Sequence, residues 1–246
     1  MLTQWDIVWE NKKIILRNKK FYSILKMKSF NMLELFKGTG SVGKVAEKDF
    51  NIVSLDLDIN SNATITIDIL EWDYKKYFEE TNFIPDFIWA SPPCNTFSIL
   101  AYKRYGRNTK TAEPISDKAK IGTNILYRAL DIIEFFKTKN PNLLFVVENP
   151  FGMMRYDKRI KELKYHLTAY CLYGFEVMKP TNFFSNFDLN LKSKKECKHK
   201  KHKETVYLKP EDRYRIPPKL IENILDDFFK TTSKNAVSDK ALQDGI

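Results

Sequence analysis

Between residues 30 and 190, short apolar runs alternate with stretches in which apolar residues recur every three or four positions. Short continuous runs that end in polar residues, glycine or proline are typical of buried strands, and the wider spacing is typical of helices. The predicted strands are residues 31–36, 51–56, 63–68, 86–90 and 142–148, and the predicted helices are residues 41–49 and 117–138. This alternation predicts an α/β fold with a doubly wound, mostly parallel, Rossmann-like sheet.

The two ends of the chain differ from this middle part. Residues 168–175 and 181–186 are each rich in aromatic and β-branched residues and predict a terminal hairpin. The expected organisation is a basic N-terminal extension (1–29), a catalytic domain (30–186), a short lysine-rich insert (187–213), a closing helix (214–230) and a flexible tail (231–246). The extension is compatible with a surface helix, and its sequence leaves open whether translation starts at Met1 or Met27.

Charge and cysteine content narrow the class of protein. The 246 residues carry a formal net charge of +10, which favours a polyanionic partner such as nucleic acid, although a merely soluble basic protein would have the same balance. Three cysteines without framework spacing indicate a reducing compartment. No apolar run is long enough for a membrane span, so we expect a soluble, intracellular protein.

A glycine-rich turn follows the first predicted strand. Gly38, Gly40 and Gly43 form the pattern G-x-G-x-x-G, which lets the backbone turn tightly and approach a nucleotide. Asp56 ends the next strand, where a carboxylate can bind ribose hydroxyls. Asp68 ends the third strand and either reaches an adenine amino group or caps the following helix. These residues predict a nucleoside cofactor, with NAD(H) and S-adenosylmethionine both compatible.

Two further strand ends carry reactive groups. Cys94 follows Pro92 and Pro93, whose rings end sheet pairing and restrict the approach to the thiol. Glu148 and Asn149 end the fifth strand and are expected at the same sheet edge. A lone cysteine is more often an inert buried residue, and Glu-Asn-Pro can simply end a strand. A thiol and a buried carboxyl group beside a cofactor site instead indicate nucleophilic catalysis with acid assistance.

At these positions the chain resembles the DNA cytosine-C5 methyltransferases, in particular a compact phage and viral branch. The resemblance extends over about residues 31–225 and rests on motifs that occur in the family's order. They are Phe36-Lys37-Gly38-Thr39-Gly40, Pro93-Cys94 with Phe97-Ser98, and Glu148-Asn149-Pro150.

The resemblance implies a class I S-adenosylmethionine-dependent methyltransferase that acts on cytosine C5 in duplex DNA, with the target base flipped out. Cys94 would be the nucleophile, Glu148 the acid at N3, and Asn149 the residue that orients it. The implied binding residues for S-adenosyl-L-methionine, and for the product S-adenosyl-L-homocysteine, are Phe36, Gly38, Thr39, Gly40, Asp56, Leu57, Asp68, Ile69 and Pro92. An NAD-linked oxidoreductase would leave Cys94 and Glu148 without roles.

Basic residues after the nucleophile provide candidate DNA contacts. Lys103, Arg104, Arg107 and Lys110 lie in a loop-like segment that closes over DNA in the family, although a solvated loop would have the same composition. The family's motif of glutamine and paired arginines is not evident, and Lys179 is the nearest basic candidate.

The segment between Asn186 and Tyr214 is much shorter than a full target-recognition domain. The recognised DNA sequence is therefore expected to be short or loosely defined, or to be selected by a protein partner. The expected location is a bacterial or host cytoplasm, a nucleoid or a viral factory. Alternative functions are an enzyme that uses RNA cytosine or a modified donor, and a catalytically silent DNA-binding protein.

The lysine-rich segment contains Cys197, His199 and His202. Their spacing is too crowded for the usual paired zinc ligands, and a fourth ligand would have to come from elsewhere, with Cys171 as a candidate. We therefore predict no metal site and interpret residues 192–203, with seven lysines in twelve positions, as a loop that touches DNA.

Overall fold

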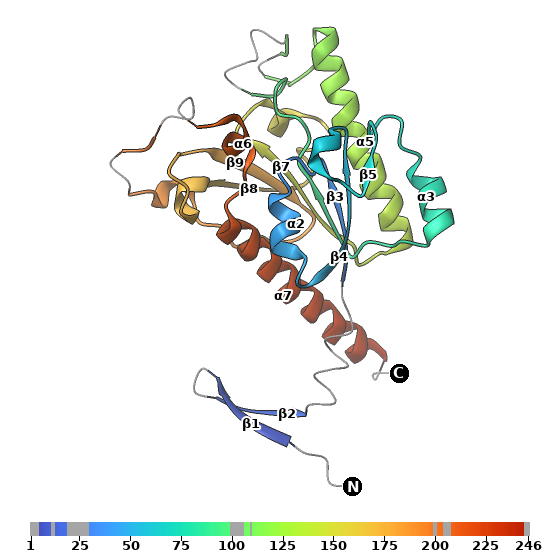
Figure 1. The fold of residues 1–246 in the computed structure, drawn as a ribbon, viewed down its shortest axis with the longest axis vertical. Helices are drawn as coiled ribbons and strands as arrows, with labels where there is room; N and C mark the ends of the chain where they lie inside the picture. The colour runs from blue at the N-terminus through green and yellow to red at the C-terminus, as the bar shows by residue number, and fades with distance from the viewer. Residues whose placement is uncertain are drawn as a thin grey trace.

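A computed structural model describes residues 5–10, 13–18, 30–98, 106–108, 110–198, 201–203 and 208–243, of which residues 5–10, 13–18, 210–211 and 236–243 are described by their backbone alone. A seven-stranded sheet with the order β5-β4-β3-β6-β7-β9-β8 forms its centre (Figure 1). The strands are β3 (Phe30–Leu35), β4 (Phe50–Asp56), β5 (Ile65–Thr66), β6 (Phe87–Ala90), β7 (Leu144–Pro150), β8 (Lys164–Ala169) and β9 (Pro180–Ser185). The five neighbouring strands β5, β4, β3, β6 and β7 run parallel to one another. Strand β9 pairs antiparallel with both β7 and β8.

This topology confirms the predicted fold class. A parallel sheet that ends in an antiparallel pair is the arrangement of the class I methyltransferases, and the pair corresponds to the predicted terminal hairpin. The first hairpin strand, predicted at residues 168–175, instead lies earlier in the chain, because β8 ends at Ala169 and a 3₁₀ turn, η3 (Tyr170–Tyr173), follows it.

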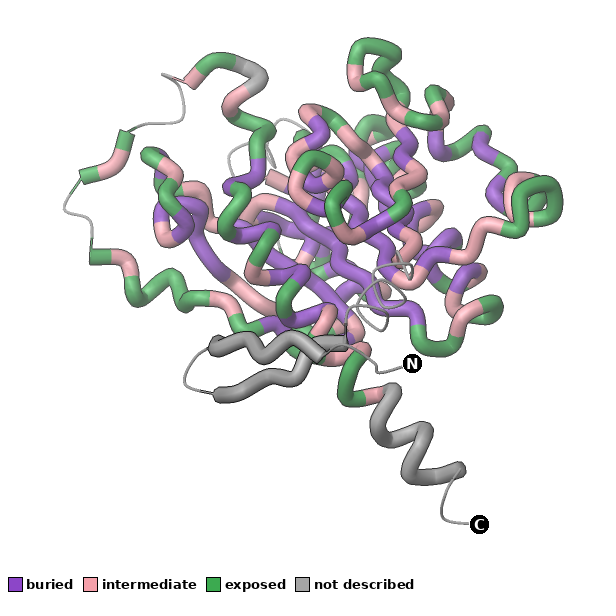
Figure 2. The backbone as a smooth tube through the Cα atoms, turned by 60° about the horizontal axis from the view of Figure 1, so that its bottom comes forward, coloured by how far each residue is buried: buried purple, intermediate pink, exposed green. Residues whose placement is uncertain are grey.

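Helices cover both faces of the sheet because successive side chains of each strand point to opposite sides. On one face, Leu33 and Ile88 pack in an apolar core with the long helix α5 (Asp117–Lys139). On the other face, Met32 and Phe87 pack in a second core that includes residues of the helices α2 (Ser41–Ala46) and α7 (Pro218–Gln243). Two shorter helices are α3 (Tyr74–Thr81) and α6 (Pro210–Tyr214). Figure 2 shows the buried segments concentrated in the centre of the molecule.

The N-terminal extension differs from the expected surface helix. Its described backbone forms two antiparallel strands, β1 (Trp5–Glu10) and β2 (Lys13–Asn18). The sequences DIVW and KIIL each contain two adjacent β-branched residues, and a short polar stretch separates them. Such an arrangement is typical of a hairpin. The many basic residues of this segment obscure that hairpin pattern.

The C-terminal end also differs from its prediction. The closing helix begins at Pro218 and continues to Gln243, through most of the expected flexible tail. Proline is well tolerated in a first helical turn, and the next glycine after it is Gly245, so no helix-breaking residue interrupts the segment. Among the described helices, none has the length and apolar character needed to cross a membrane.

Candidate active site

The carboxyl ends of the parallel strands open into a cavity of about 320 Å³. Open α/β sheets bind their ligands at this edge. The cavity brings together residues that are far apart in the sequence, including most of the predicted cofactor and catalytic residues. Those in its wall are Phe36, Gly38, Thr39, Asp56, Leu57, Asp68, Ile69, Pro92, Cys94, Glu148 and Lys179.

The glycine-rich turn connects β3 to α2 and is fixed to the end of β4. The Gly38 amide donates to Asp56 Oδ2 at 2.7 Å, and the Asp58 amide donates to Asp56 Oδ1 at 2.8 Å. Gly38 and Gly40 have φ angles of 51° and 66°, values at which glycine avoids the strain of a side chain. Gly40 lies in the wall of a neighbouring hollow and not of the main cavity.

Asp68 does not cap the following helix. Its Oδ1 accepts from the Leu70 amide at 2.9 Å within its own turn, while Asp73 is the residue that caps α3 and accepts from the Lys76 amide. Asp68 is therefore fixed by a local turn in the cavity wall, and its contact with a cofactor stays a prediction.

Glu34 is a site residue that the sequence analysis missed. It lies in β3, is 2% exposed, and its Oε1 accepts from the Gly43 amide at 3.3 Å. Its Oε2 has no hydrogen-bond partner among the described residues, although Glu34 lines the cavity. Burial raises the pKa of Glu34 from 4.5 to about 7. An acidic residue within the otherwise apolar run MLELF, directly before the glycine turn, was the available signal.

The proline turn presents Cys94 at the end of β6. Asn149 Nδ2 donates to the Pro92 carbonyl at 2.8 Å, which holds the turn against the end of β7. The Cys94 carbonyl accepts from the amides of Phe97 and Ser98 at 3.0 and 2.9 Å, so the chain turns back directly after the thiol. Burial and the nearby Glu148 raise the pKa of Cys94, and Lys179 partly opposes them.

Glu148 is buried at the neighbouring strand end. Tyr170 donates its hydroxyl to Glu148 Oε1 at 3.2 Å, and the Ser91 side chain also hydrogen-bonds to the carboxyl group. Trp89 Nε1 donates to Ser91 Oγ at 3.0 Å, which orients that hydroxyl. Burial raises the pKa of Glu148, while Lys179 and these hydrogen bonds oppose the rise. A protonated carboxyl group can therefore persist closer to neutrality here than in water.

Comparison with known proteins decides the family. The chain is 30% identical to the "Probable DNA (cytosine-5)-methyltransferase" of Frog virus 3 (isolate Goorha) over 223 residues, which are 79% of this chain and 98% of that protein. The chain belongs to the DNA (cytosine-5)-methyltransferase family. No family model matches it.

Solved structures of methyltransferases are similar at lower identity. One is a putative DNA modification methyltransferase from an E. coli prophage, with 17% identity, a TM-score of 0.44, and coverage of 66% of this chain and 49% of that chain. Another is the S. pombe Dnmt2 methyltransferase, with 15% identity, a TM-score of 0.43, and coverage of 74% and 61%. This methyltransferase thus spans less than two thirds of the length of either structure.

Lys179, predicted as a basic contact to the nucleic acid, lies in the cavity wall of this methyltransferase. Its Nζ donates to the Arg213 carbonyl at 3.0 Å and lies 4.8 Å from the centre of the Tyr170 ring. Lys179 therefore places a positive charge beside Glu148 and Cys94, which opposes but does not cancel the rise in the pKa of both groups.

The basic loop of the methyltransferase differs from its prediction at Arg107. Arg107 is 3% exposed, and its guanidinium stacks on the Phe97 ring with 3.8 Å to the ring centre. It donates to the carbonyls of Thr96, Ala112 and Ala119 and to the hydroxyls of Thr96 and Thr123. With its donors engaged in the interior, Arg107 holds the loop together and does not reach a phosphate in this conformation. Lys110 is exposed, and Lys103 and Arg104 lie outside the described residues.

Proposed function

We propose that this methyltransferase transfers a methyl group from S-adenosyl-L-methionine to C5 of cytosine in DNA, through a covalent adduct between Cys94 and C6. The observation that carries the proposal is the shared cavity. Cys94 and Glu148, which can activate a pyrimidine, line the same space as Gly38 and Asp56, which can bind a nucleoside. Membership of the DNA (cytosine-5)-methyltransferase family supports the same substrate.

The chemistry of the cavity wall fits S-adenosylmethionine. Asp56 offers carboxylate lone pairs to ribose hydroxyls, and Leu57 and Ile69 offer apolar surface to adenine. The unpartnered Glu34 Oε2 is suited to the positively charged methionine end of the cofactor. When bound, the cofactor supplies an electrophilic methyl group beside the nucleophile.

Cytosine C5 becomes nucleophilic only after addition at C6. After the thiol proton of Cys94 is lost to solvent, the sulfur forms a bond to C6. The electrons of the C5–C6 double bond move into the C4–C5 bond, and those of the C4–N3 double bond move to N3, which takes a proton from Glu148. The raised pKa of Glu148 favours this donor role near neutrality. After C5 has taken the methyl group, N3 returns its proton to Glu148 and the C5 proton passes to solvent. The electrons of the C5–H bond form the C5–C6 double bond, and the C6–S bond breaks with its electrons going to the Cys94 sulfur.

Asn149 acts as a positioning residue. Its side-chain amide ties the Pro92 carbonyl to the strand end that carries Glu148, so nucleophile and acid keep a fixed separation. Asn149 is 1% exposed, and its Oδ1 has no partner among the described residues.

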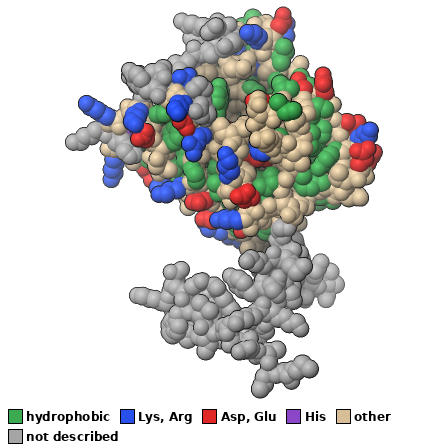
Figure 3. Space-filling model, in the orientation of Figure 1, with side chains coloured by type: hydrophobic (Ala, Val, Ile, Leu, Met, Phe, Trp, Pro, Cys, Tyr) green, Lys and Arg blue, Asp and Glu red, His purple; other side chains and the backbone are tan. Residues whose placement is uncertain are grey.

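Access to this cavity requires that the target cytosine leave the duplex. A base within stacked DNA cannot reach a thiol that is itself partly buried, so the base is flipped into the cavity. We propose Lys179, Lys110, Lys103 and Arg104 as contacts to the nucleic acid. Lys and Arg side chains gather on the left of the face in Figure 3, over the end of the molecule where Figure 1 places β8 and β9.

The test incubates the full chain with a labelled methyl donor and either duplex DNA of varied sequence or RNA, and then digests the nucleic acid to nucleosides. We expect labelled 5-methylcytosine from DNA, and none from the Cys94→Ser variant. Label in RNA alone would move the substrate to RNA. Absence of product from every substrate, with salt-sensitive DNA binding retained, would identify a silent DNA-binding protein.

A further inference from the structure

A second cluster of reactive side chains lies outside the catalytic cavity. Cys171 belongs to η3, and Cys197 and His202 belong to the lysine-rich segment that begins around η4 (Lys194–Glu196). Cys171 Sγ lies 3.5 Å from Cys197 Sγ, and Cys197 Sγ lies 3.2 Å from His202 Nε2. The three ligand atoms all lie within 4.8 Å of one another. The proposed methyl transfer uses none of these residues.

These separations are those of ligands around one metal ion. Tetrahedral zinc with Zn–S bonds of about 2.3 Å and Zn–N bonds of about 2.0 Å separates two sulfurs by about 3.8 Å and a sulfur from a nitrogen by about 3.5 Å. The observed distances of 3.5 and 3.2 Å are slightly shorter. A disulfide would instead require a sulfur–sulfur distance of about 2.05 Å.

We propose that Cys171, Cys197 and His202 bind a structural zinc ion. Two thiolates and one imidazole are a ligand set that favours zinc over calcium, magnesium or manganese, which prefer oxygen. Two thiolates also neutralise the charge of the divalent ion, so the site forms without an acidic neighbour. The fourth position is completed by water or by one further side chain. His199, which the sequence analysis also considered, lies outside the described residues.

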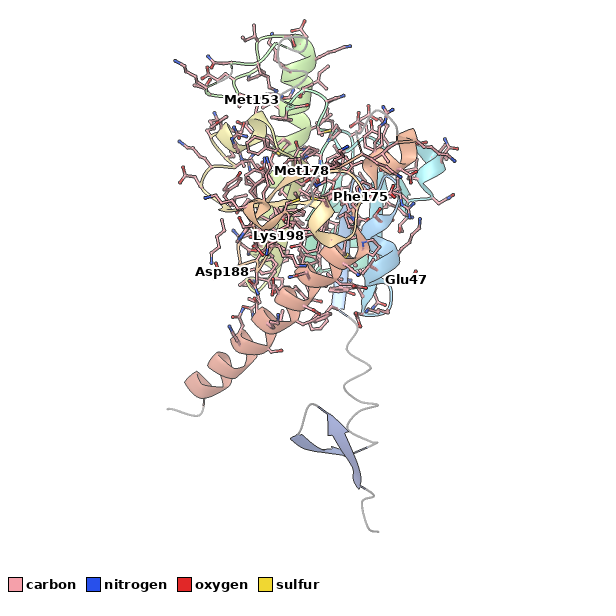
Figure 4. All side chains as sticks on the ribbon, turned by 90° about the vertical axis from the view of Figure 1, so that its left-hand side faces the viewer. Glu47, Met153, Phe175, Met178, Asp188 and Lys198 are labelled. Atoms are coloured by element: carbon pink, nitrogen blue, oxygen red, sulfur yellow. The ribbon has the colours of Figure 1, made fainter. Side chains whose placement is uncertain are left out.

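The cluster revises the interpretation of the lysine-rich segment as a plain loop. The segment is already attached at both ends: Thr168 Oγ1 donates to the Lys192 carbonyl at 2.7 Å, and the Lys203 amide donates to the Glu176 carbonyl at 3.1 Å. A metal between these attachments fixes the middle of the segment to η3. Figure 4 faces this end of the molecule and labels Phe175 and Lys198, which lie on the two stretches of chain that the cluster joins.

Zinc at this position would also support the catalytic wall. Cys171 directly follows Tyr170, whose hydroxyl bonds to Glu148. The ion would therefore tie a lysine-bearing surface to the strand end that carries the catalytic acid. This supporting role rests on the proposed function, whereas the metal site itself does not.

The test measures metal and not activity. Untagged full-length protein, produced with zinc in the medium and purified under reducing conditions, is analysed for zinc by mass spectrometry, and we expect about one zinc ion per chain. The metal-free protein is then titrated with Co²⁺ alone. Tetrahedral coordination by thiolates predicts visible ligand-field bands and a near-ultraviolet sulfur-to-cobalt band.

Matched variants identify the ligands. Cys171→Ser, Cys197→Ser and His202→Ala should each lose the bound zinc and weaken cobalt binding at least about tenfold. Cys94→Ser is the control, because it removes the chain's remaining cysteine and should keep both the zinc and the cobalt spectrum. His202→Cys replaces the imidazole by another zinc ligand. Unlike His202→Ala, it should therefore bind the metal, and its sulfur-to-cobalt band should be stronger than that of the wild type.

Three results would overturn the proposal. The first is a chain without zinc that gives no tetrahedral cobalt spectrum. The second is loss of metal from Cys94→Ser to the same extent as from Cys197→Ser. The third is a Cys171–Cys197 disulfide in protein prepared under reducing conditions, detected by mass spectrometry of unreduced peptides. Circular dichroism of each variant separates loss of a ligand from loss of the fold.

Discussion

Cys94 is a thiol in the free protein, because burial and the Glu148 carboxyl group both raise its pKa. A thiol is a weak nucleophile, and the thiolate forms readily only when those two influences are relieved. Binding of cytosine would relieve one of them, since a hydrogen bond from Glu148 to N3 ends the repulsion between the carboxylate and the sulfur. The pair therefore couples nucleophile activation to the presence of the base.

This coupling predicts how the reactivity of Cys94 depends on pH. In the wild type, alkylation of Cys94 by iodoacetamide should increase through pH 9 and above. Glu148→Gln removes the negative neighbour, so the pKa of Cys94 should fall and its alkylation profile should shift to lower pH, while methyl transfer is lost. Peptide mass spectrometry reports modification at Cys94 separately from the other cysteines. An unchanged profile would show that Glu148 does not act on the thiol.

The buried carboxyl group of Glu34 is expected to lower the stability of the fold above neutral pH while it strengthens cofactor binding. Because its pKa is raised from 4.5 to about 7, the folded chain binds more protons than the unfolded chain in that pH range, and stability falls as pH rises through it. Glu34→Gln does not titrate, so at pH 8 it should increase the free energy of unfolding by roughly 1–3 kcal/mol. At pH 4 the variant and the wild type should differ little.

The same substitution should weaken binding of S-adenosylmethionine about tenfold, because the carboxylate that faces its cationic end is gone. Urea unfolding at the two pH values and calorimetric titration of the cofactor measure the two effects. Equal stability at both pH values, or unchanged cofactor affinity, would contradict the assigned role of Glu34.

Most cavity residues could be predicted from the sequence because they stand at strand ends. Asp56, Cys94 and Glu148 each follow an apolar run, and parallel strands bring such residues to one edge. Glu34 lies inside a strand, where an apolar pattern indicates core and conceals a buried acid. The cluster at Cys171 was also underestimated, because spacing along the chain does not show that η3 and the lysine-rich segment lie side by side.

At the scale of elements, the loop after the nucleophile depends on Arg107. Composition alone cannot separate a buried arginine from one that binds phosphate, because both occur in polar loops. The distinction comes from tertiary structure: the Arg107 guanidinium satisfies carbonyls of the loop and of the first turn of α5. Removal of the guanidinium would deprive the buried Thr96 and Ala112 carbonyls of this donor, whereas the Ala119 carbonyl also accepts from Thr123.

Arg107→Met keeps an aliphatic chain of similar length but removes the N–H donors of the guanidinium. We expect the free energy of unfolding to fall by about 2–4 kcal/mol, with methyl transfer reduced because the loop next to Cys94 loosens. Lys110→Ala is the matched control in the same loop. Lys110 is exposed, so its loss should change stability by less than about 0.5 kcal/mol and weaken DNA binding instead. The reverse outcome in urea unfolding and DNA titration would restore Arg107 as a phosphate contact.

The elements that the sequence analysis misplaced share one cause. In β1 and β2, alternation of apolar residues competes with many charges, and in the second half of α7 the apolar stripe ends while helix-compatible residues continue. Pattern recognition relies on a regular apolar stripe, so it fails where the sequence of an element carries none.

For the molecule as a whole, the net charge of +10 predicts binding to DNA that depends strongly on salt. If about four phosphates are contacted, raising monovalent salt from about 50 to 200 mM should weaken binding about 100-fold. Fluorescence anisotropy with labelled duplex measures this slope. Lys110→Ala should reduce the salt slope by the amount expected for about one phosphate contact. A wild-type slope near zero would remove the electrostatic basis for DNA as the substrate.

Covalent trapping tests the central claim most directly. Duplex DNA that contains 5-fluorocytosine is incubated with the full chain and S-adenosylmethionine, because the fluorine at C5 cannot leave as a proton does and the adduct at C6 persists. We predict a denaturation-resistant complex linked through Cys94, which peptide mass spectrometry locates, and no complex with Cys94→Ala. No complex with the wild type, or an equal yield from Cys94→Ala, would contradict the proposed mechanism.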